Sequence, residues 1–198
     1  MAEHYFSNSP TSKSDKRKWQ FSLRGRTMQF YSDHGVFSKG EVDFGSRLLI
    51  ETFELPVVEG ALLDVGCGYG PIGLSLAKEF DRHVDMVDVN ERAMELAAEN
   101  AQLNGVKNVR IFSSSVYENV QGSYAAILSN PPIRAGKQVV HEILEKAYNH
   151  LVVGGELWIV IQKKQGAPSA IAKMEEVFGS AEIVEKKKGY YIIKSKKR

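Results

Sequence analysis

Residues 61–73 read ALLDVGCGYGPIG. An apolar run from Ala61 to Val65 leads directly into a glycine-rich loop, and a helix-like segment follows from about Pro71. Glycine allows a tight backbone turn and the close approach of a ligand. In an open parallel sheet, ligands bind beyond the carboxyl ends of the strands, where such a loop lies. The stretch therefore predicts the first strand of a parallel sheet with a binding site at its end.

The rest of the chain repeats this alternation of apolar runs and helix-like segments. Strands are expected at 61–65, 83–89, 109–113, 124–130, 156–162, 181–187 and 190–195, and helices near 71–80, 91–104, 137–150 and 167–178. The alternation is typical of an α/β fold, a parallel sheet with helices on both faces. Because only Lys188-Gly189 joins the last two strands, they form a hairpin and the last strand runs antiparallel.

The first 55 residues are expected to form a small extension of this core. A hairpin is predicted around Arg24-Gly25-Arg26, followed by a helix from Asp43 to Phe53 with Leu48 and Leu49 facing inward. Residues 1–14 are rich in Ser, Asn and Pro and are expected to be disordered. We therefore divide the single domain, residues 15–198, into an N-terminal extension (15–55) and an α/β core (56–198).

Composition excludes several classes of protein. At 198 residues and 43% hydrophobic content, the chain fits one globular domain. The chain contains no run of 18 uncharged apolar residues, so no membrane-spanning helix is expected. Residues 1–18 do not have the pattern of a secretory signal peptide. Cys67 is the only cysteine and the five histidines are scattered, so neither a disulfide nor a metal site is expected. The sequence predicts a cytoplasmic protein, and it does not indicate an oligomeric state.

Charge is distributed unevenly along the chain. The net charge is only +2, yet residues 13–26 hold six basic residues against Asp15, and residues 186–198 hold seven and no acid. The remaining 13 basic and 23 acidic residues give the rest of the chain a net charge of −10. Basic ends on an acidic body favour a polyanionic partner such as nucleic acid, although tails that merely keep a chain soluble have the same composition.

The glycine loop allows two cofactors. Asp88 closes the second strand, where a carboxylate can accept hydrogen bonds from ribose hydroxyls. Gly68-Tyr-Gly70-Pro-Ile-Gly73 matches G-x-G-x-x-G, the fingerprint of NAD binding. However, the tight turn already begins at Gly66, and the preceding acid, Asp64, suits an ammonium group and would repel a pyrophosphate. The loop therefore favours S-adenosylmethionine, and NAD remains the alternative.

Residues 127–136, ILSNPPIRAG, form a second polar strand end. Proline has a fixed φ and no N–H, so Pro131 and Pro132 cannot extend a central strand. They can hold the Asn130 side chain and nearby carbonyl groups rigidly at the sheet edge. From the residues alone, this corner is either a set of fixed hydrogen-bond acceptors or a surface turn capped by Asn130.

The glycine loop, Asp88 and the Asn130-Pro131-Pro132-Ile133 corner, in this order, resemble class I S-adenosylmethionine-dependent methyltransferases. Within that class, the chain is similar to the methyltransferase small domain group, which includes the bacterial enzymes that methylate guanine N2 in 16S ribosomal RNA. Residues 35–51 and 99–109 also match segments of that group, and the resemblance covers roughly residues 18–198. It implies a Rossmann-like seven-stranded sheet in the order 3-2-1-4-5-7-6, with the last strand antiparallel.

The resemblance also implies a role for each site residue. The catalytic corner is Asn130, Pro131 and Pro132, in which the Asn130 side-chain oxygen and the Pro131 carbonyl accept the hydrogens of the target amine. Ile133 and Arg134 are expected to contact the substrate. The residues expected to contact S-adenosylmethionine are Phe37, Asp43, Asp64, Gly66, Cys67, Gly68, Gly70, Asp88, Val89, Ser115 and Asn130.

The chain departs from the family pattern at three places. Ile133 replaces a usual aromatic residue, Arg134 replaces a usual histidine, and Ser113-Ser114-Ser115 stands where the family often has an aspartate. Stacking on the target base would then fall to Phe37 or Tyr69. These differences leave methyl transfer as the expected reaction and leave the target nucleotide open.

Several functions are consistent with this sequence. The leading hypothesis is an RNA base N-methyltransferase that acts on guanine N2 of ribosomal RNA. The same corner occurs in enzymes that methylate protein glutamine or DNA adenine. A nucleic-acid-binding module with a vestigial cofactor site and a dehydrogenase are the remaining alternatives, although the chain shows no acid/base pair suited to hydride transfer.

Overall fold

The computed structural model describes residues 13–33 and 40–198. Nine strands and five α-helices lie in these ranges. The strands are β1 (Arg17–Leu23), β2 (Arg26–Ser32), β3 (Leu62–Val65), β4 (Val84–Asp88), β5 (Val109–Ser113), β6 (Tyr124–Ser129), β7 (Leu151–Gln162), β8 (Glu182–Lys187) and β9 (Tyr190–Lys196). The helices are α1 (Phe44–Thr52), α2 (Pro71–Glu79), α3 (Glu91–Leu103), α4 (Lys137–Lys146) and α5 (Ala167–Phe178), with short 3-10 turns η1 (Ile133–Ala135), η2 (Ala147–His150) and η3 (Lys163–Gln165).

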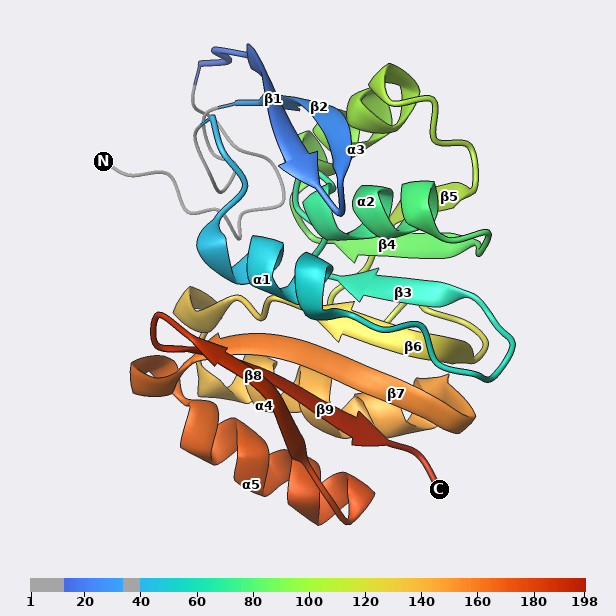
Figure 1. The fold of residues 1–198 in the computed structure, drawn as a ribbon, viewed down its shortest axis with the longest axis vertical. Helices are drawn as coiled ribbons and strands as arrows, with labels where there is room; N and C mark the ends of the chain where they lie inside the picture. The colour runs from blue at the N-terminus through green and yellow to red at the C-terminus, as the bar shows by residue number, and fades with distance from the viewer. Residues whose placement is uncertain (1–12, 34–39) are drawn as a thin grey trace.

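The central sheet has seven strands in the order β5-β4-β3-β6-β7-β9-β8 (Figure 1). β9 is antiparallel to both of its neighbours, and the other six strands point the same way. Counted from β3 as the first strand of the core, this order is 3-2-1-4-5-7-6. The predicted fold class and topology are therefore confirmed, and the carboxyl ends of five consecutive parallel strands share one edge.

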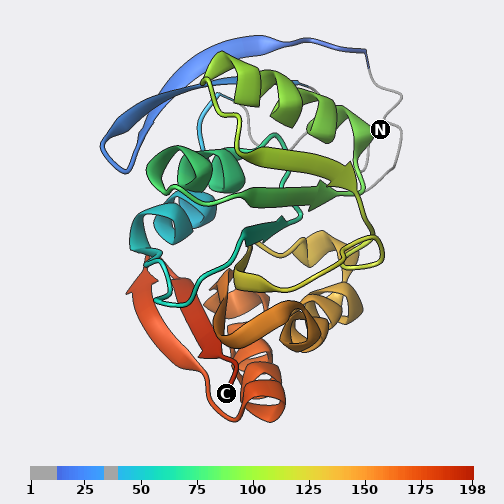
Figure 2. The ribbon, with the colours of Figure 1, turned by 90° about the vertical axis from the view of Figure 1, so that its right-hand side faces the viewer.

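Two hydrophobic clusters fill the two faces of the sheet. Alternate residues of each strand enter opposite clusters, because side chains along a strand point to opposite faces. Leu62 and Leu128 pack with α1, α2 and α3, whereas Leu63 and Ile127 pack with α4 and α5. Figure 2 shows α1 and α2 on one side of the sheet and α4 on the other. The edge of the sheet at the carboxyl ends of the parallel strands is thus held between two packed hydrophobic clusters.

Both predicted hairpins have the tight turns that their sequences indicated. Arg24 and Gly25 have φ values of 50° and 72°, and Lys188 and Gly189 have φ values of 50° and 80°. A two-residue hairpin turn of this kind needs positive φ at both central positions, which glycine supplies at little cost. The β8–β9 turn brings the start of β9 to the carboxyl edge of the parallel strands.

The β1–β2 hairpin docks on α3 through two asparagines one helical turn apart. Asn100 exchanges hydrogen bonds with the backbone of Tyr31, and Asn104 does the same with Gln29, at 2.6–3.1 Å. Side-chain amides here satisfy the strand edge as a neighbouring strand would. The hairpin is therefore fixed to the core along β2.

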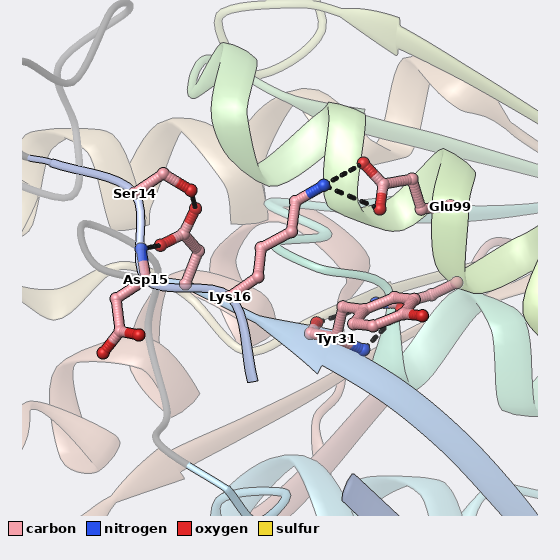
Figure 3. A network of polar contacts seen from close by, with 7 residues as sticks. Ser14, Asp15, Lys16, Tyr31 and Glu99 are labelled. Atoms are coloured by element: carbon pink, nitrogen blue, oxygen red, sulfur yellow. Dashed lines mark hydrogen bonds and ion pairs between the residues drawn. The ribbon is translucent and has the colours of Figure 1, made fainter. Parts of the chain in front are cut away.

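The chain entering β1 is held by polar contacts that Figure 3 shows in close-up. Ser14 Oγ and the backbone N–H of Asp15 donate to Asp33, each at 2.6 Å, and Lys16 pairs with Glu99 on α3 at 2.6 Å. Of the segment expected to be disordered, residues 1–12 lie outside the described residues.

The third quarter of the chain differs from the sequence prediction. The helix predicted over 137–150 ends at Lys146 and continues as a 3-10 turn, and β7 begins at Leu151 rather than at 156. Gly154 and Gly155 concealed the start of this strand because glycine weakens a strand pattern. In the structure they exchange backbone hydrogen bonds with Lys197, and the β6–β7 register is irregular there.

Candidate active site

A cavity of about 740 Å³ lies at the carboxyl edge of the parallel strands. Residues at or just after the ends of β3, β4, β5, β6 and β7 line it, and α1 and the start of β9 complete the wall. The main lining stretches are residues 65–69, 88–89, 113–116, 130–135 and 160–162. The location agrees with the rule that open α/β sheets bind ligands beyond their strand ends.

Most of the residues predicted from the sequence meet at this cavity. Those that line it are Asp43, Gly66, Cys67, Gly68, Asp88, Val89, Ser115, Asn130, Pro131, Pro132, Ile133 and Arg134. Asp64 and Gly70 do not line it, and Phe37 lies outside the described residues. The fold therefore brings predicted site residues together at one cavity although they are up to 91 positions apart, from Asp43 to Arg134.

The N–H groups of the glycine loop are used inside the protein. Gly66 and Cys67 both donate to the carbonyl oxygen of Val87 at 2.9 Å, and Gly70 donates to that of Cys67 at 3.1 Å. Gly68 donates to Asp88 Oδ2 at 2.8 Å. A pyrophosphate site needs such N–H groups to point at the ligand. The loop is therefore shaped for a ligand that contacts it without phosphate binding.

Asp64 closes the N-terminus of α2. Pro71, the first residue of this helix, has no N–H, and Gly73 donates its N–H to Asp64 Oδ2 at 2.9 Å. A carboxylate in this position would repel a pyrophosphate, which the NAD interpretation places at the helix N-terminus. The position of Asp64 therefore argues against the NAD interpretation of this loop.

The same carboxyl group is deeply buried. Asp64 is 1% exposed, and its Oδ1 has no hydrogen-bond partner in the described part of the chain. Burial, partly opposed by the Gly73 N–H and reinforced by Asp88, raises the pKa of Asp64 to about 7. Asp64 thus lies behind the loop, where its open oxygen is a candidate partner for a cation, and its expected contact with an ammonium group stays a prediction.

Gly70 and Gly73 serve packing. Gly70 has a φ of 105°, and a Cβ at that position would lie 2.7 Å from Leu74. A Cβ on Gly73 would lie 2.7 Å from Met86 on β4. Gly73 therefore lets α2 approach β4 closely, and Gly70 forms the N-terminal boundary of this helix, while its expected contact with the cofactor stays a prediction.

Asp88 is 4% exposed at the end of β4. Its two carboxylate oxygens accept the backbone N–H groups of Gly68 and Asn90 at 2.8 and 2.9 Å. These bonds fix the carboxylate against the cavity, and each oxygen retains capacity for a further hydrogen bond. A fixed acceptor of this kind suits the hydroxyl groups of a ribose.

The segment after β5 forms the next part of the wall. Ser114 Oγ donates to the carbonyl of Val116 and accepts from the N–H of Asn119, at 2.9 and 3.0 Å. Val116 has a φ of 54°, a sparsely populated conformation for a β-branched residue. Ser115 is exposed beside it and lines the cavity. Residues 113–116 therefore form a strained part of the site that is held by its own hydrogen bonds.

The corner after β6 is held by hydrogen bonds from α1. Asn130 donates from Nδ2 to Asp43 Oδ2 at 3.1 Å and to Ser46 Oγ at 3.0 Å. An ionised carboxylate can only accept hydrogen bonds, so Asp43 fixes which end of the amide is the donor. The amide oxygen of Asn130 therefore remains as the acceptor at the cavity.

Asp43 itself is held by the helix that it begins. As the N-cap residue of α1, its Oδ2 also accepts the N–H of Ser46 at 2.9 Å. The contact with the cofactor that the resemblance implies for Asp43 stays a prediction; in the structure Asp43 lines the cavity and binds Ser46 and Asn130. Ser46 escaped the sequence analysis, although it stands in the quoted stretch 35–51.

The prolines and their neighbours complete the corner. Ser129 Oγ donates to the carbonyl of Val65 at 2.9 Å and ties the ends of β6 and β3 together. Pro131 is buried, and the carbonyl of Pro132 accepts the N–H of Ala135 at 2.9 Å. Ile133 packs against the cluster under α4, while Arg134 is exposed. The surface-turn alternative is excluded because the corner is built into the cavity wall.

One further expectation changes, and two residues of the cavity wall were not predicted. Tyr69 is 2% exposed, with its ring packed against Trp19 and Phe30 at centroid distances of 5.9 and 5.6 Å, so it is not a stacking platform for a base. Gln162 and Tyr190 line the cavity, and the Gln162 amide donates to the Tyr190 hydroxyl at 2.6 Å. Neither residue was identified as part of the site from the sequence.

Cys67 does not read as a nucleophile. It is 4% exposed, and burial, with the charges of Asp88 and Asp64, raises the pKa of its thiol well above the usual range. A reactive cysteine needs a stabilised thiolate.

In the described ranges there is also no His, Cys, Asp and Glu cluster suited to a metal ion, and no helix long and apolar enough to span a membrane.

Several known proteins are similar to this chain in sequence and in fold. The chain matches the family model of the methyltransferase small domain over residues 27–194. It is 64% identical over 200 residues, 100% of both chains, to a Bacillus subtilis (strain 168) protein named "Uncharacterized protein YbxB". It is 34% identical over 187 residues to ribosomal RNA small subunit methyltransferase C of Aliivibrio salmonicida, which covers 91% of this chain and 53% of that protein.

A solved structure of the same kind superposes closely. The T. thermophilus 16S rRNA N2 G1207 methyltransferase (RsmC), in complex with AdoMet and guanosine, has a TM-score of 0.85 at 26% identity and covers 94% of this chain and 52% of that chain. The chain thus spans about half the length of these two named methyltransferases. The matches confirm the expected class, an S-adenosylmethionine-dependent methyltransferase, and its cofactor. The chain belongs to the methyltransferase small domain family.

Proposed function

We propose that this protein methylates the exocyclic amine of a base in RNA, and that its target is guanine N2 in small-subunit ribosomal RNA. Two findings support the proposal. The Asn130 corner presents fixed acceptors suited to an amine, and the named relatives include ribosomal RNA methyltransferases, one of them solved with guanosine.

The orientation of Asn130 is the observation that carries the proposal. An exocyclic amine is a poor nucleophile because its lone pair is conjugated into the ring. Acceptors that bind its two hydrogens favour a tetrahedral nitrogen, whose lone pair is no longer conjugated into the ring and can point toward the methyl group. Asp43 and Ser46 take the Nδ2 hydrogens of Asn130, so its oxygen is left to accept one amine hydrogen. The Pro131 carbonyl, rigid because of the two prolines, accepts the other.

The chain's residues then act by positioning. S-adenosylmethionine, when bound, supplies an electrophilic methyl group. Asp88 is placed to hold the ribose hydroxyls, and the glycine loop leaves room for close contact. Asn130 and Pro131 hold the amine in line with that group, which favours reaction by reducing the entropy cost of alignment. The proton lost by the methylated nitrogen passes to water.

The other functions weighed from the sequence make different products. A protein glutamine methyltransferase labels polypeptide, a DNA adenine methyltransferase labels DNA, and a vestigial module labels nothing. The bonds that hold Asp88, Asp64 Oδ2 and the Asn130 amide argue against a degenerate site, because these groups keep defined partners.

The test uses tritiated S-adenosylmethionine with purified protein and three acceptors: small ribosomal subunits, their naked RNA, and total cell protein. Nucleoside mass spectrometry then identifies the product. We expect label in RNA as N2-methylguanosine, formed about 10²-fold or more slowly by the Asn130→Ala variant. Label confined to protein would overturn the RNA substrate, and methylated adenine in RNA would overturn the guanine target.

A further inference from the structure

Five lysines gather at the cavity edge of the sheet from two segments of the chain. Lys163 and Lys164 lie in η3, directly after β7, and Lys186, Lys187 and Lys188 lie at the end of β8 and in its turn. We call them the rim lysines. All five are exposed.

Hydrogen bonds join these two segments to each other and to the cavity. The N–H of Lys163 donates to the carbonyl of Gly189 at 2.9 Å. Lys187 and Gln162 both pair with Tyr190 in the sheet register, and Gln162 and Tyr190 line the cavity. The β8–β9 turn therefore lies beside the start of α1 and the end of β7, as Figure 1 shows. The rim lysines do not line the cavity themselves, but they are adjacent in the chain or in the sheet to Gln162, Gln165 and Tyr190, which do.

Their charges are not neutralised. None of the rim lysines forms an ion pair in the part of the chain that the structure describes. Two of them lie over aromatic rings, Lys186 over Tyr191 and Lys188 over Phe44, each at 4.9 Å from the ring centroid. These contacts hold the chains without cancelling the charge.

The basic residues near the N-terminus contrast with them. Lys16 pairs with Glu99 at 2.6 Å, Arg17 with Asp15 at 3.1 Å and Arg26 with Glu79 at 2.9 Å. Arg24 donates to the backbone carbonyls of Ile50 and Phe53. The sequence indicated two basic ends, but four of the six basic residues of the N-terminal segment already have partners: Lys16 and Arg26 pair with acids of the body, Arg17 pairs with Asp15 of the same segment, and Arg24 binds backbone carbonyls.

We infer that the rim lysines bind the phosphates of the RNA strand that carries the target base, and that the N-terminal basic segment does not. Five unpaired like charges repel one another, and a polyanion relieves this repulsion with release of its counterions. Phosphates at the rim would leave the attached base free to enter the cavity. The inference rests on the proposed RNA substrate and adds where the strand is held.

The test compares two variants with the same change in net charge. The rim variant combines Lys163→Gln, Lys164→Gln, Lys186→Gln and Lys187→Gln. The control variant combines Lys16→Gln, Arg17→Gln, Lys18→Gln and Arg26→Gln. Lys188 stays unchanged in the rim variant because its φ of 50° belongs to the hairpin turn.

Binding of a fluorescent single-stranded RNA 20-mer is measured between 50 and 200 mM salt. Each phosphate contact with a single strand contributes about 0.7 to the slope of log affinity against log salt. We expect the rim variant to lose about tenfold or more in affinity at 50 mM and to have a slope shallower by about 0.7 per lost contact. The control variant should lose less than about threefold. Both should retain wild-type affinity for S-adenosylhomocysteine and the wild-type melting temperature.

Equal losses in the two variants would overturn the inference, because they would reflect net charge alone. So would an unchanged rim variant, or competition by polyglutamate as effective as competition by RNA, which would indicate an acidic protein partner. Because binding is read without turnover, the result is independent of the methylation assay. Label found only in protein would reject the proposed function even if the rim variant bound RNA weakly.

Discussion

The two walls of the cavity are held in place by different means. The glycine-loop wall is fixed by main-chain donors: Gly66 and Cys67 bind the Val87 carbonyl, and Gly68 binds Asp88. The Asn130 corner is fixed by side chains of α1, Asp43 and Ser46, which lie 87 and 84 positions earlier in the chain. The first wall thus depends on backbone conformation and buried carboxylates, and the second on three side chains that must meet.

The difference implies a division of labour that substitutions can test. Changes in the loop wall should alter cofactor affinity or stability, whereas changes in the corner should alter turnover. A substitution in one wall that produced the other wall's effect would break the comparison.

The largest effect is expected from Asn130→Ala. The Asn130 oxygen acts mainly when the amine becomes a nucleophile, so turnover should fall by about 10²–10³-fold, as for the loss of one transition-state hydrogen bond. Affinity for S-adenosylhomocysteine should stay within about twofold of wild type. A tritiated-methyl assay and calorimetry measure the two quantities. Lost cofactor binding with retained turnover would assign the corner to the cofactor pocket.

The next effect concerns pH and Asp64. Its pKa is raised from 3.8 to about 7 in the folded state, so the folded protein binds the proton more tightly than the unfolded chain. The stabilisation is fully present below about pH 4 and is lost as the pH rises through about 7. At 1.36 kcal/mol per pKa unit, it amounts to about 4 kcal/mol.

Urea unfolding of the cofactor-free protein from pH 4 to 8 measures this contribution against Asp64→Asn. Asparagine keeps an acceptor for the Gly73 N–H and does not titrate in this range. The wild type should lose more stability than the variant as the pH rises. Parallel curves for the two proteins would show that Asp64 does not carry the titration.

Asp88→Ala should produce a smaller loss, confined to the cofactor. The change leaves the N–H groups of Gly68 and Asn90 without their acceptor and removes the predicted ribose contact. Affinity for S-adenosylhomocysteine should fall by about 1–3 kcal/mol, the usual range for a charge-assisted hydrogen bond. Turnover at saturating S-adenosylmethionine should change much less. A large drop in turnover at saturation would contradict the division between the walls.

The smallest effect is expected from Asp43→Asn. Asparagine caps a helix about as well as aspartate, so α1 and the melting temperature should be preserved. Its side chain can also donate, so it no longer fixes the Asn130 amide. Turnover should fall by about tenfold with an unchanged KM for S-adenosylmethionine. Ser46→Ala, which leaves the Asp43 contact in place, serves as the milder companion. Full activity in Asp43→Asn would rule out the positioning role.

Local patterns predicted most of the fold. The strands, the reversed last strand and both hairpin turns follow from periodicity and from glycines that accept positive φ, as at Gly25 and Gly189, whereas the strand order was implied by the family resemblance. The early start of β7 was missed because Gly154 and Gly155 weaken a strand pattern and are stabilised only by Lys197, more than 40 residues away. The mid-chain cavity residues were also predictable, because the carboxyl ends of parallel strands share one edge.

The sequence by itself determined the conformation of the glycine loop and the rigidity of the Asn130-Pro131-Pro132 corner, since φ preferences and missing N–H groups belong to single residues. Only the tertiary structure decided that Asp64 is buried behind the loop, that Asp43 orients Asn130, and that the rim lysines are unpaired while Lys16 is not. Burial, hydrogen-bond partners and the neutralisation of charge depend on which distant side chains the fold brings within a few ångströms. No property of the single residue specifies them.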